Sequence, residues 1–243
     1  MNENLIGFQA VCHKILPVII IFTMMKKFIA VLFTLIILVT LTTLCACDLK
    51  EEPQEDGNIS REVLAFYAGE NEDFAVSIDV MKREKAFIAD GRTTDVVGTA
   101  ELIIVPLKVH DNSEYSFAIT DGTSTLSGKI KGNQFGEYCQ EIAIDFAPTS
   151  IIIGEGDSAQ TINIVNILQG KLTSADVINI AEKEFEERIL SEKETGEYNR
   201  EIYVKLITGD RQHYYYYVSY IGEGVDYWAL LLDPETGAVV SKK

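Results

Sequence analysis

The sequence predicts a mainly β protein with a small α+β part at its carboxyl end. Two patterns indicate this. Short apolar stretches with alternating residues recur at roughly ten-residue spacing through residues 62–168. One amphipathic helical stretch followed by three strand-like stretches fills residues 171–243. We therefore expect two small domains, an antiparallel β-sandwich over 62–168 and a helix on an antiparallel sheet over 171–243.

An uncharged stretch from Phe28 to Ala46 lies near the amino end, directly after two lysines. Basic residues, an apolar run and small residues at its end are the parts of a secretory signal peptide. An uncleaved membrane-spanning helix is the alternative, because about 18 apolar residues can cross a bilayer. Signal peptides begin close to their basic residues. We therefore expect translation to start at one of the two methionines before the lysines, with residues 1–23 as an upstream extension.

The apolar stretch ends in Leu44-Cys45-Ala46-Cys47. This resembles the lipobox of bacterial lipoproteins, with an aliphatic residue at −3 and a small residue at −1 relative to the lipidated cysteine. The resemblance implies removal of residues 1–46 by cleavage between Ala46 and Cys47, and acylation of Cys47, palmitate included. It also implies a cell-envelope protein anchored by membrane lipid on the extracytoplasmic face of the cell membrane. Two or more acyl chains suffice for stable attachment.

The charge balance excludes nucleic acid as a partner. The chain has 21 Lys and Arg against 37 Asp and Glu, a formal charge of −16, whereas phosphate binding needs clustered basic residues. Cleavage before Cys47 removes three lysines and one glutamate, so the processed chain would carry −18. Residues 47–61 are polar and read as the lipidated cysteine followed by a flexible linker. Cys139 is then the one remaining free thiol, which leaves no intramolecular disulfide.

Within the first domain, Phe74, Val76 and Ile78 alternate with smaller or polar residues, as in a strand with one buried face. Residues 102–105 are apolar on both faces, as in a central strand. Turns are expected at Asp121-Gly122 and at residues 154–157. The expected strands are 74–81, 85–89, 96–105, 115–120, 125–130, 142–146, 151–153 and 161–167. This number and spacing of strands predict a sandwich of the immunoglobulin-like kind.

In the second domain, Thr173 and Asp176 form a capping-box pattern before a helix whose apolar stripe runs from Val177 to Ile189. A charged loop is expected over 191–200. Three strands and a short last one follow, at residues 202–208, 214–221, 227–233 and 238–240.

Two stretches of this domain, Ser174–Ala181 and Leu230–Val240, are similar to the start of the helix and the terminal strand-turn-strand of the PepSY domain, a module of bacterial envelope proteins and protease propeptides. The resemblance covers about 70 residues and depends on the Asp233-Pro234-Glu235-Thr236-Gly237 turn. It implies a protein-binding module that influences extracytoplasmic peptidases or the assembly of other envelope proteins. It transfers no catalytic residue.

A cluster of aromatic residues on the expected sheet is the candidate partner-binding surface. It consists of Tyr214, Tyr215, Tyr216, Tyr217, Tyr220 and Trp228. Alternation along a strand places Tyr214 and Tyr216 on one face and Tyr215 and Tyr217 on the other. Tyrosine combines apolar area with a hydroxyl and is common at binding surfaces. Cross-strand aromatic packing for stability alone is the alternative.

The sequence offers no recognisable catalytic, metal or cofactor motif. Cys139 has no accompanying histidine pattern. The acidic turns lack the spacing of a calcium loop, and turn chemistry explains their residues. We therefore expect a non-enzymatic binding module without a cofactor. A hydrolase with paired carboxylates in the middle domain and a passive structural subunit of an envelope assembly remain as alternatives.

Overall fold

The computed structural model describes residues 58–108, 113–133, 137–224 and 226–243. The described part is mainly β with two α-helices, which confirms the coarse fold class. The strands are β1 (Ile59–Glu70), β2 (Phe74–Glu84), β3 (Val96–Pro106), β4 (Glu114–Thr120), β5 (Thr125–Lys131), β6 (Tyr138–Ile142), β7 (Ser150–Ile153), β8 (Gln160–Asn163), β9 (Val165–Asn166), β10 (Glu201–Thr208), β11 (Tyr214–Ile221), β12 (Tyr227–Leu232) and β13 (Val239–Lys242). The helices are α2 (Ser174–Glu184) and α3 (Glu186–Thr195), and a 3-10 turn spans Gly156–Ser158.

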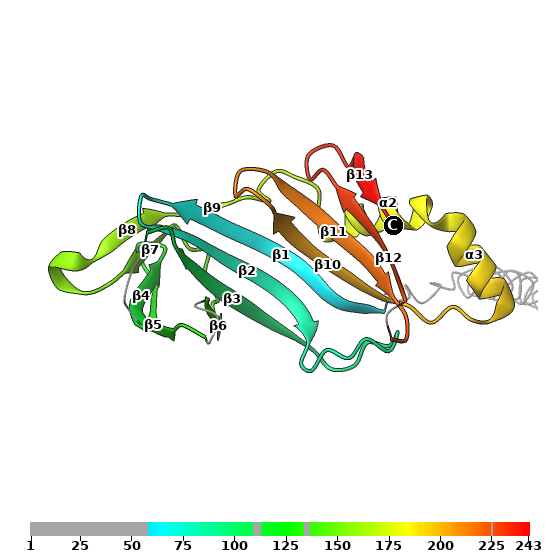
Figure 1. Ribbon diagram of the computed structural model, residues 1–243, viewed down its shortest axis with the longest axis horizontal. Coiled ribbons are helices and arrows are strands. Elements are labelled where there is room, and N and C mark those ends of the chain that lie inside the picture. The colour runs from blue at the N-terminus through cyan, green and yellow to red at the C-terminus, as the bar shows by residue number, and fades with distance from the viewer. Residues whose placement is uncertain (1–57, 109–112, 134–136, 225) are drawn as a thin grey trace, which may run out of the picture. The chain divides into compact units, whose positions relative to one another are not determined.

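One long mixed sheet runs through the described chain in the order β13-β12-β11-β10-β1-β2-β3-β6, with β9 also paired to β1 (Figure 1). Strand β1 is the junction. It is antiparallel to β2 over most of its length and parallel to β10 at Ile59 and Arg61. The sheet therefore passes directly from the residues expected in the first domain to those expected in the second, and all of them lie within one compact unit.

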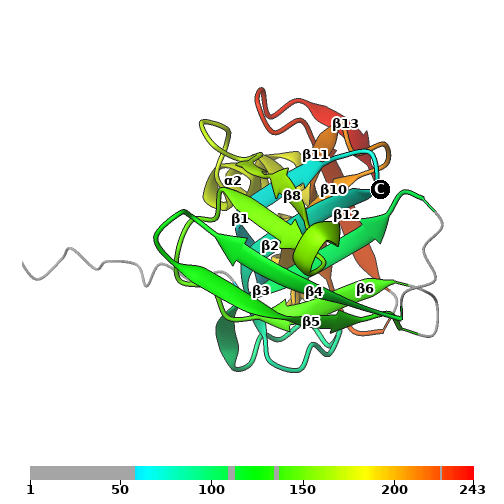
Figure 2. The ribbon, with the colours of Figure 1, turned by 90° about the vertical axis from the view of Figure 1, so that its left-hand side faces the viewer.

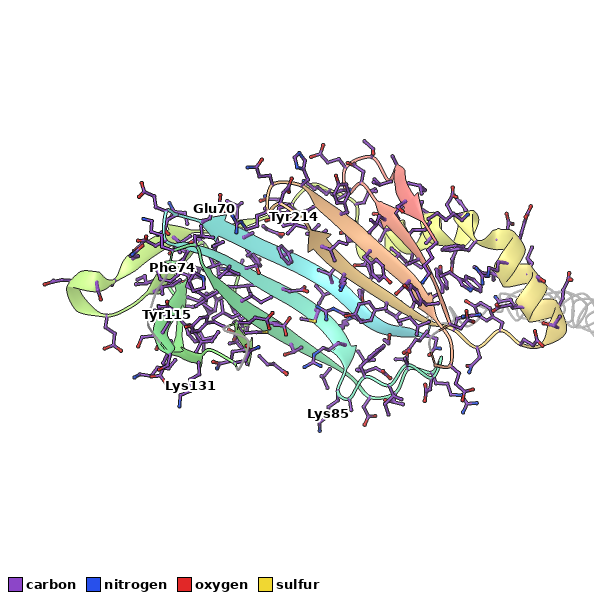
Figure 3. All side chains as sticks on the ribbon, viewed as in Figure 1. Glu70, Phe74, Lys85, Tyr115, Lys131 and Tyr214 are labelled. Atoms are coloured by element: carbon purple, nitrogen blue, oxygen red, sulfur yellow. The ribbon has the colours of Figure 1, made fainter. Side chains whose placement is uncertain are left out.

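A second sheet, in the order β5-β4-β7-β8, packs on part of the long one (Figure 2). The core between them takes its side chains from β2, β3 and β6 of the long sheet and from all four strands of the small one. Phe74 of β2 and Tyr115 of β4 meet edge to face in this core, with ring centroids 5.2 Å apart (Figure 3). Packing of two sheets around alternating inward residues is what the sequence pattern predicts for a sandwich.

A second core lies under α2, between the helix and strands β1, β10, β11 and β12. The helix begins at the predicted capping box, where the Asp176 N–H donates to the Thr173 hydroxyl and the Thr173 N–H donates to the Asp176 carboxylate. Val177 and Ala181 on its buried stripe are fully inaccessible. The capping box and the start of the helix are thus as predicted, but the expected single helix through Ile189 is interrupted at Phe185, where α2 ends and α3 begins.

Four local expectations were wrong. Residues 85–89 do not return as a hairpin strand, because the chain after Lys85 (labelled in Figure 3) runs through an irregular loop to β3. Ile144 and Phe146 pack against the sandwich core without forming a strand. The expected loop over 191–200 is helical as far as Thr195 and ends at Gly196, which has a φ of 73°. Strand β1 begins at Ile59, inside the segment expected to be a flexible linker.

Candidate functional site

Half of the tyrosine-rich cluster is structural. Tyr220 and Trp228 are fully buried and Tyr216 is 1% exposed. Their rings complete the core under α2, where Phe185 packs against Tyr220 and Trp228 with centroids 5.6 and 5.4 Å away. The Tyr216 hydroxyl donates to the Leu172 carbonyl at 2.7 Å. These three residues present almost no surface to a partner in the folded chain.

Tyr214 lies at the edge of the same core, where its ring packs against Phe66 at 5.6 Å. Both rings line a pocket of about 370 Å³ at one end of the long sheet, together with Arg211. Arg211 forms an ion pair with Glu70 at 3.5 Å, and Glu70 and Tyr214 are labelled at this end of the sheet in Figure 3. Tyr215 is half-buried and lines neither this pocket nor the next one.

Tyr217 lines a different pocket of about 300 Å³, which we call the tyrosine pocket. Its walls come from β1, β2, β10, β11 and β12 and from the loops after β2 and β11. Four rings surround it, those of Phe87, Tyr203, Tyr217 and Tyr227. The polar side chains that reach it are Ser60, Arg61, Arg83, Glu84, Lys205 and Ser219. A concave, largely apolar site with a few converging polar groups is the usual form of a small-ligand site.

The register of the strands explains why these residues meet. Arg61 of β1 lies beside Arg83 of β2 and beside Tyr203 of β10, and Tyr203 lies opposite Ser219 of β11. These four residues form one row across four strands. Lys205 and Tyr217 form the next row on that face, since they are directly paired and two residues further along.

The rings and cations of the pocket are packed against one another. Phe87 meets the Tyr203 ring at 5.6 Å with a T-shaped geometry. Arg61 lies 5.4 Å from the same ring and donates to the Tyr203 hydroxyl at 3.0 Å. The Lys205 ammonium lies 5.9 Å from the Tyr203 ring and 5.6 Å from the Tyr217 ring. Aromatic faces attract cations at such distances, so the rings hold the lysine at the pocket.

Two of the three cations are neutralised. Arg61 forms an ion pair with Asp79 at 2.6 Å, and Arg83 forms one with Glu141 at 2.7 Å. Burial raises the pKa of the Asp79 carboxyl although Arg61 acts in the opposite direction. Lys205, by contrast, forms no ion pair with any residue that the structure describes. Its charge nevertheless acts on the nearby Asp79 carboxyl, where it lowers the pKa together with Arg61.

Three polar atoms of the pocket's lining residues are buried without a hydrogen-bond partner in the described part of the chain. They are Arg61 Nε, Glu84 Oε2 and Ser219 Oγ. The other Glu84 oxygen accepts from the backbone N–H and the hydroxyl of Thr94. Buried polar atoms in native proteins nearly always have a partner. These three atoms have almost no accessible surface, so they lie behind the pocket wall and do not contact the space inside the cavity.

A second carboxyl lies close to Glu84. Glu201 at the start of β10 is fully buried, and neither of its oxygens has a partner with hydrogen-bond geometry among the described residues. Burial raises the pKa of Glu201 to about 7, and the nearby Glu84 and Asp90 charges act in the same direction, while Ser60 lowers it. Glu201 does not line the tyrosine pocket.

The other candidates from the sequence have ordinary structural roles. Cys139 is exposed on β6, and desolvation together with Glu101 raises the pKa of its thiol to about 12, which leaves little nucleophilic thiolate. The Asp121 carboxylate accepts from the N–H groups of Thr123 and Ser124 within its own turn. No group of three potential metal ligands occurs among the residues that the structure describes.

The predicted signal peptide and lipidation site, Ala46 and Cys47 included, lie outside the described residues. Neither α2 nor α3 has the length and apolar character needed to cross a membrane. Comparison of the chain with protein-family models, with curated proteins and with solved structures gives no match.

Of the six aromatic residues predicted to contact a partner, only Tyr217 lines the tyrosine pocket. Sequence reasoning missed Arg61, Arg83, Glu84 and Lys205. For Lys205, the sequence did contain a signal of its position in the sheet. Lys205 interrupts the apolar strand Ile202-Tyr203-Val204-Lys205-Leu206-Ile207 at a position that alternates with buried residues, so it had to lie on the face away from the helix.

Proposed function

We propose that the chain is a membrane-anchored extracytoplasmic lipoprotein that acts as a non-enzymatic binding module, with the tyrosine pocket as its binding site. The observation that carries the binding role is the pocket itself. It combines four rings with Lys205, which lies beside two of them and forms no ion pair with the described residues.

The architecture is compatible with the finer family assignments, which belong to this proposal. The two packed sheets support an immunoglobulin-like arrangement, and α2 on β10–β12 supports a PepSY-like module. The Asp233 carboxylate accepts from the N–H groups of Glu235 and Thr236, and Gly237 has a φ of 70°, so the terminal motif forms a self-contained turn. If the PepSY likeness extends to function, the partner is an envelope peptidase or another envelope protein.

A hydrolase that uses paired carboxylates is the second candidate. Glu84 and Glu201 interact electrostatically, and burial raises the pKa of Glu201. A general acid must reach the substrate, however. Glu201 is fully buried and only Glu84 lines the pocket, so this pair supports binding better than catalysis. The passive structural subunit has no observation that favours it.

Photocrosslinking in living cells tests the binding role. Benzoylphenylalanine in place of Tyr217 should give a light-dependent adduct, detected as an added mass on the intact protein or on a crosslinked partner. The same group in place of Leu190, which is 52% exposed on α3, should give none. Equal crosslinking from both positions, or none from position 217, would count against the tyrosine pocket as a binding site.

Lipid labelling tests the anchor. Growth with a labelled fatty acid should label the wild-type protein, and Cys47→Ala should abolish the label and release the protein from the membrane fraction. Retained labelling of Cys47→Ala would refute the anchor while leaving the binding role open.

A further inference from the structure

Residues 85–95, which connect β2 to β3, form a loop that lies against the beginnings of β1 and β10. The Asn58 side chain holds this β2–β3 loop at two points, since its Nδ2 donates to the Gly91 carbonyl and its Oδ1 accepts from the Thr93 N–H. The same Nδ2 donates to the Arg200 carbonyl at 3.0 Å. One amide side chain therefore ties the middle of the loop to the residue before β10.

Two further hydrogen bonds that hold the β2–β3 loop to its surroundings are long. Asn199 Nδ2 donates to the Asp90 carbonyl at 3.2 Å, and the Gly224 N–H donates to the Ala89 carbonyl at 3.3 Å. Both distances lie at or above the upper end of the usual range for such bonds. Residues 85–88 are exposed. A segment with long hydrogen bonds and exposed side chains opens locally at a lower free energy than the core does.

The β2–β3 loop covers the fully buried carboxyl of Glu201. Burial, and then the charges of Glu84 on β2 and Asp90 in the loop, raise the pKa of Glu201 to about 7. The Ser60 hydroxyl of β1 and the Gly91 N–H of the loop lower this pKa. The backbone of the loop therefore lies against this carboxyl, and one of the loop's own charges acts on it.

The cation nearest to Glu201 along the chain, Arg200, has other partners. It forms ion pairs with Glu192 at 2.7 Å and with Asp226 at 2.5 Å. On β11, the direct partner of Glu201 is the apolar residue Ile221. Within the described part of the chain, the charges that act most strongly on Glu201 are thus negative ones, from β2 and from the loop.

Ionisation of Glu201 weakens the contact between the loop and the sheet. A buried charge that faces no cation is costly. Glu84 Oε1 accepts from the N–H and the hydroxyl of Thr94, so one of the two carboxylates that repel a charged Glu201 also anchors the loop. Movement of the loop away from β10 admits water to Glu201 and separates it from Asp90.

The β2–β3 loop also forms one wall of the tyrosine pocket. The Phe87 ring meets the Tyr203 ring there at 5.6 Å, and Gly224, whose N–H donates to Ala89 of the loop, lines the pocket as well. We propose that the β2–β3 loop is a pH-sensitive closure of the tyrosine pocket, closed while Glu201 carries a proton and open once Glu201 ionises. This proposal concerns the position of the loop and does not depend on the binding role proposed above.

The size of the effect follows from proton linkage. Well below pH 4.5, Glu201 is neutral whether the loop is open or closed. With the loop open, water reaches Glu201 and its pKa returns to the ordinary value of 4.5, so between pH 4.5 and about 7 opening releases a proton and becomes more favourable as the pH rises. The opening equilibrium constant then rises about tenfold from pH 6 to pH 8 and about seventyfold from pH 5 to pH 8.

Amide hydrogen exchange of the full-length chain in detergent with EDTA, resolved by fragmentation in the mass spectrometer, tests the proposal at pH 5, 6 and 8. The reporters are the N–H groups of Thr93 and Thr94, which donate to Asn58 and Glu84. After correction for the intrinsic pH dependence of exchange, their protection factors should fall about tenfold from pH 6 to pH 8.

Glu201→Gln cannot ionise, so its loop protection should be the same at all three pH values. Glu187→Gln, at an exposed position on α3, is the matched control and should follow the wild type. If Glu201→Gln does not fold, Asp90→Asn decides. It removes one charge that acts on Glu201 and keeps an acceptor for the Arg92 N–H, so it should reduce the fall.

The amide of Ile119, in the core strand β4, reports global unfolding. Loop amides as strongly protected as Ile119 would show that the loop opens only when the whole fold does, and the proposal would be overturned. A tenfold fall in Glu201→Gln would overturn it too, because another group would then control the loop. If millimolar Ca²⁺ restored the protection of the wild type at pH 8, the two glutamates would be a cation site instead. Crosslinking at Tyr217 enters none of these comparisons, so failure of the loop proposal and failure of the binding role are distinguishable.

Discussion

Replacing Glu201 with Gln should stabilise the folded chain above neutral pH and change its stability at pH 5 by less than about 1 kcal/mol. Glu201 is fully buried at the start of β10, and burial raises its pKa from the ordinary value of 4.5 to about 7. The folded state therefore retains a proton that the unfolded state releases. Glutamine has the same shape as the protonated carboxyl but cannot ionise.

The sign follows from proton linkage. Well below pH 4.5 the carboxyl is neutral in both states and does not oppose folding. As the pH rises from 4.5 to about 7, the unfolded state loses its proton first, so the free energy of unfolding falls. The pKa difference corresponds to about 3 kcal/mol, reached above pH 7. Relaxation around a charged Glu201 reduces this figure, so we expect a gain of about 2–3 kcal/mol for Glu201→Gln at pH 8.

Urea denaturation at pH 5, 6, 7 and 8 measures this difference. Glu187→Gln, at an exposed position on α3, is the control and should follow the wild type throughout. Parallel pH profiles of the wild type and Glu201→Gln would show that the carboxyl is already ionised in the folded chain, and the argument from burial would then be wrong.

Three further outcomes test the packing and the chemistry of the fold. Trp228→Ala should lower the free energy of unfolding in urea by about 3–5 kcal/mol, because it leaves a cavity in the core under α2. Tyr215→Ala, at a half-buried position, should lower it by less than about 1 kcal/mol. Similar losses in the two variants would contradict the difference in burial. Gly69→Ala should destabilise by about 1–3 kcal/mol, since a Cβ there would lie 2.1 Å from the Asn163 carbonyl oxygen, while Gly98→Ala has open space and should cost nothing measurable; a tolerated Gly69→Ala would contradict this close approach. Iodoacetamide should alkylate Cys139 at pH 8 on the order of a hundredfold more slowly in the folded protein than in urea, because the pKa of its thiol is raised to about 12 in the folded protein. Peptide mass spectrometry follows the reaction, and equal rates would refute the raised pKa.

The elements that local patterns could predict are those whose pairing is also local. The alternation from Phe74 to Val80 predicted β2, and the strands of β4 and β5 were placed from the turn between them. The capping box located the start of α2. In each case a period of two or of 3.6 residues, bounded by a turn or cap, carries the information within a few neighbouring residues.

Strand β1 was missed because its pattern is interrupted. A bulge between Val63 and Ala65 changes the alternation, so that Val63, Phe66 and Ala68 all enter the core under α2. Its parallel partner β10 lies far away in the chain, and no local signal encodes that pairing. At Ile144 and Phe146 a strand was predicted that does not form. Their alternation places both side chains against the sandwich core without strand pairing.

The pocket was missed for a related reason. Arg61, Glu84 and Lys205 each look like an ordinary surface charge in the sequence, and only the register across β2, β1 and β10 brings them together. The tyrosine-rich stretch was conspicuous, yet most of its aromatic side chains pack in the core under α2. Conspicuous composition identified the strand but not the face that holds the pocket.

The parallel pairing of β1 with β10 sets an order on the assembly of this fold. Ile59 and Ile202 are partners although 143 positions separate them. Contacts between such distant residues form late, because the entropy cost of closing a long loop comes before the favourable energy of the contacts. The hairpins β2–β3 and β4–β5 can form while the rest of the chain is still emerging, whereas the edge of β1 at Ile59 and Arg61 stays unpaired until β10 arrives. The tyrosine pocket spans this last joint, so a chain that stops short of β10 can bury a sandwich core and still be unable to bind.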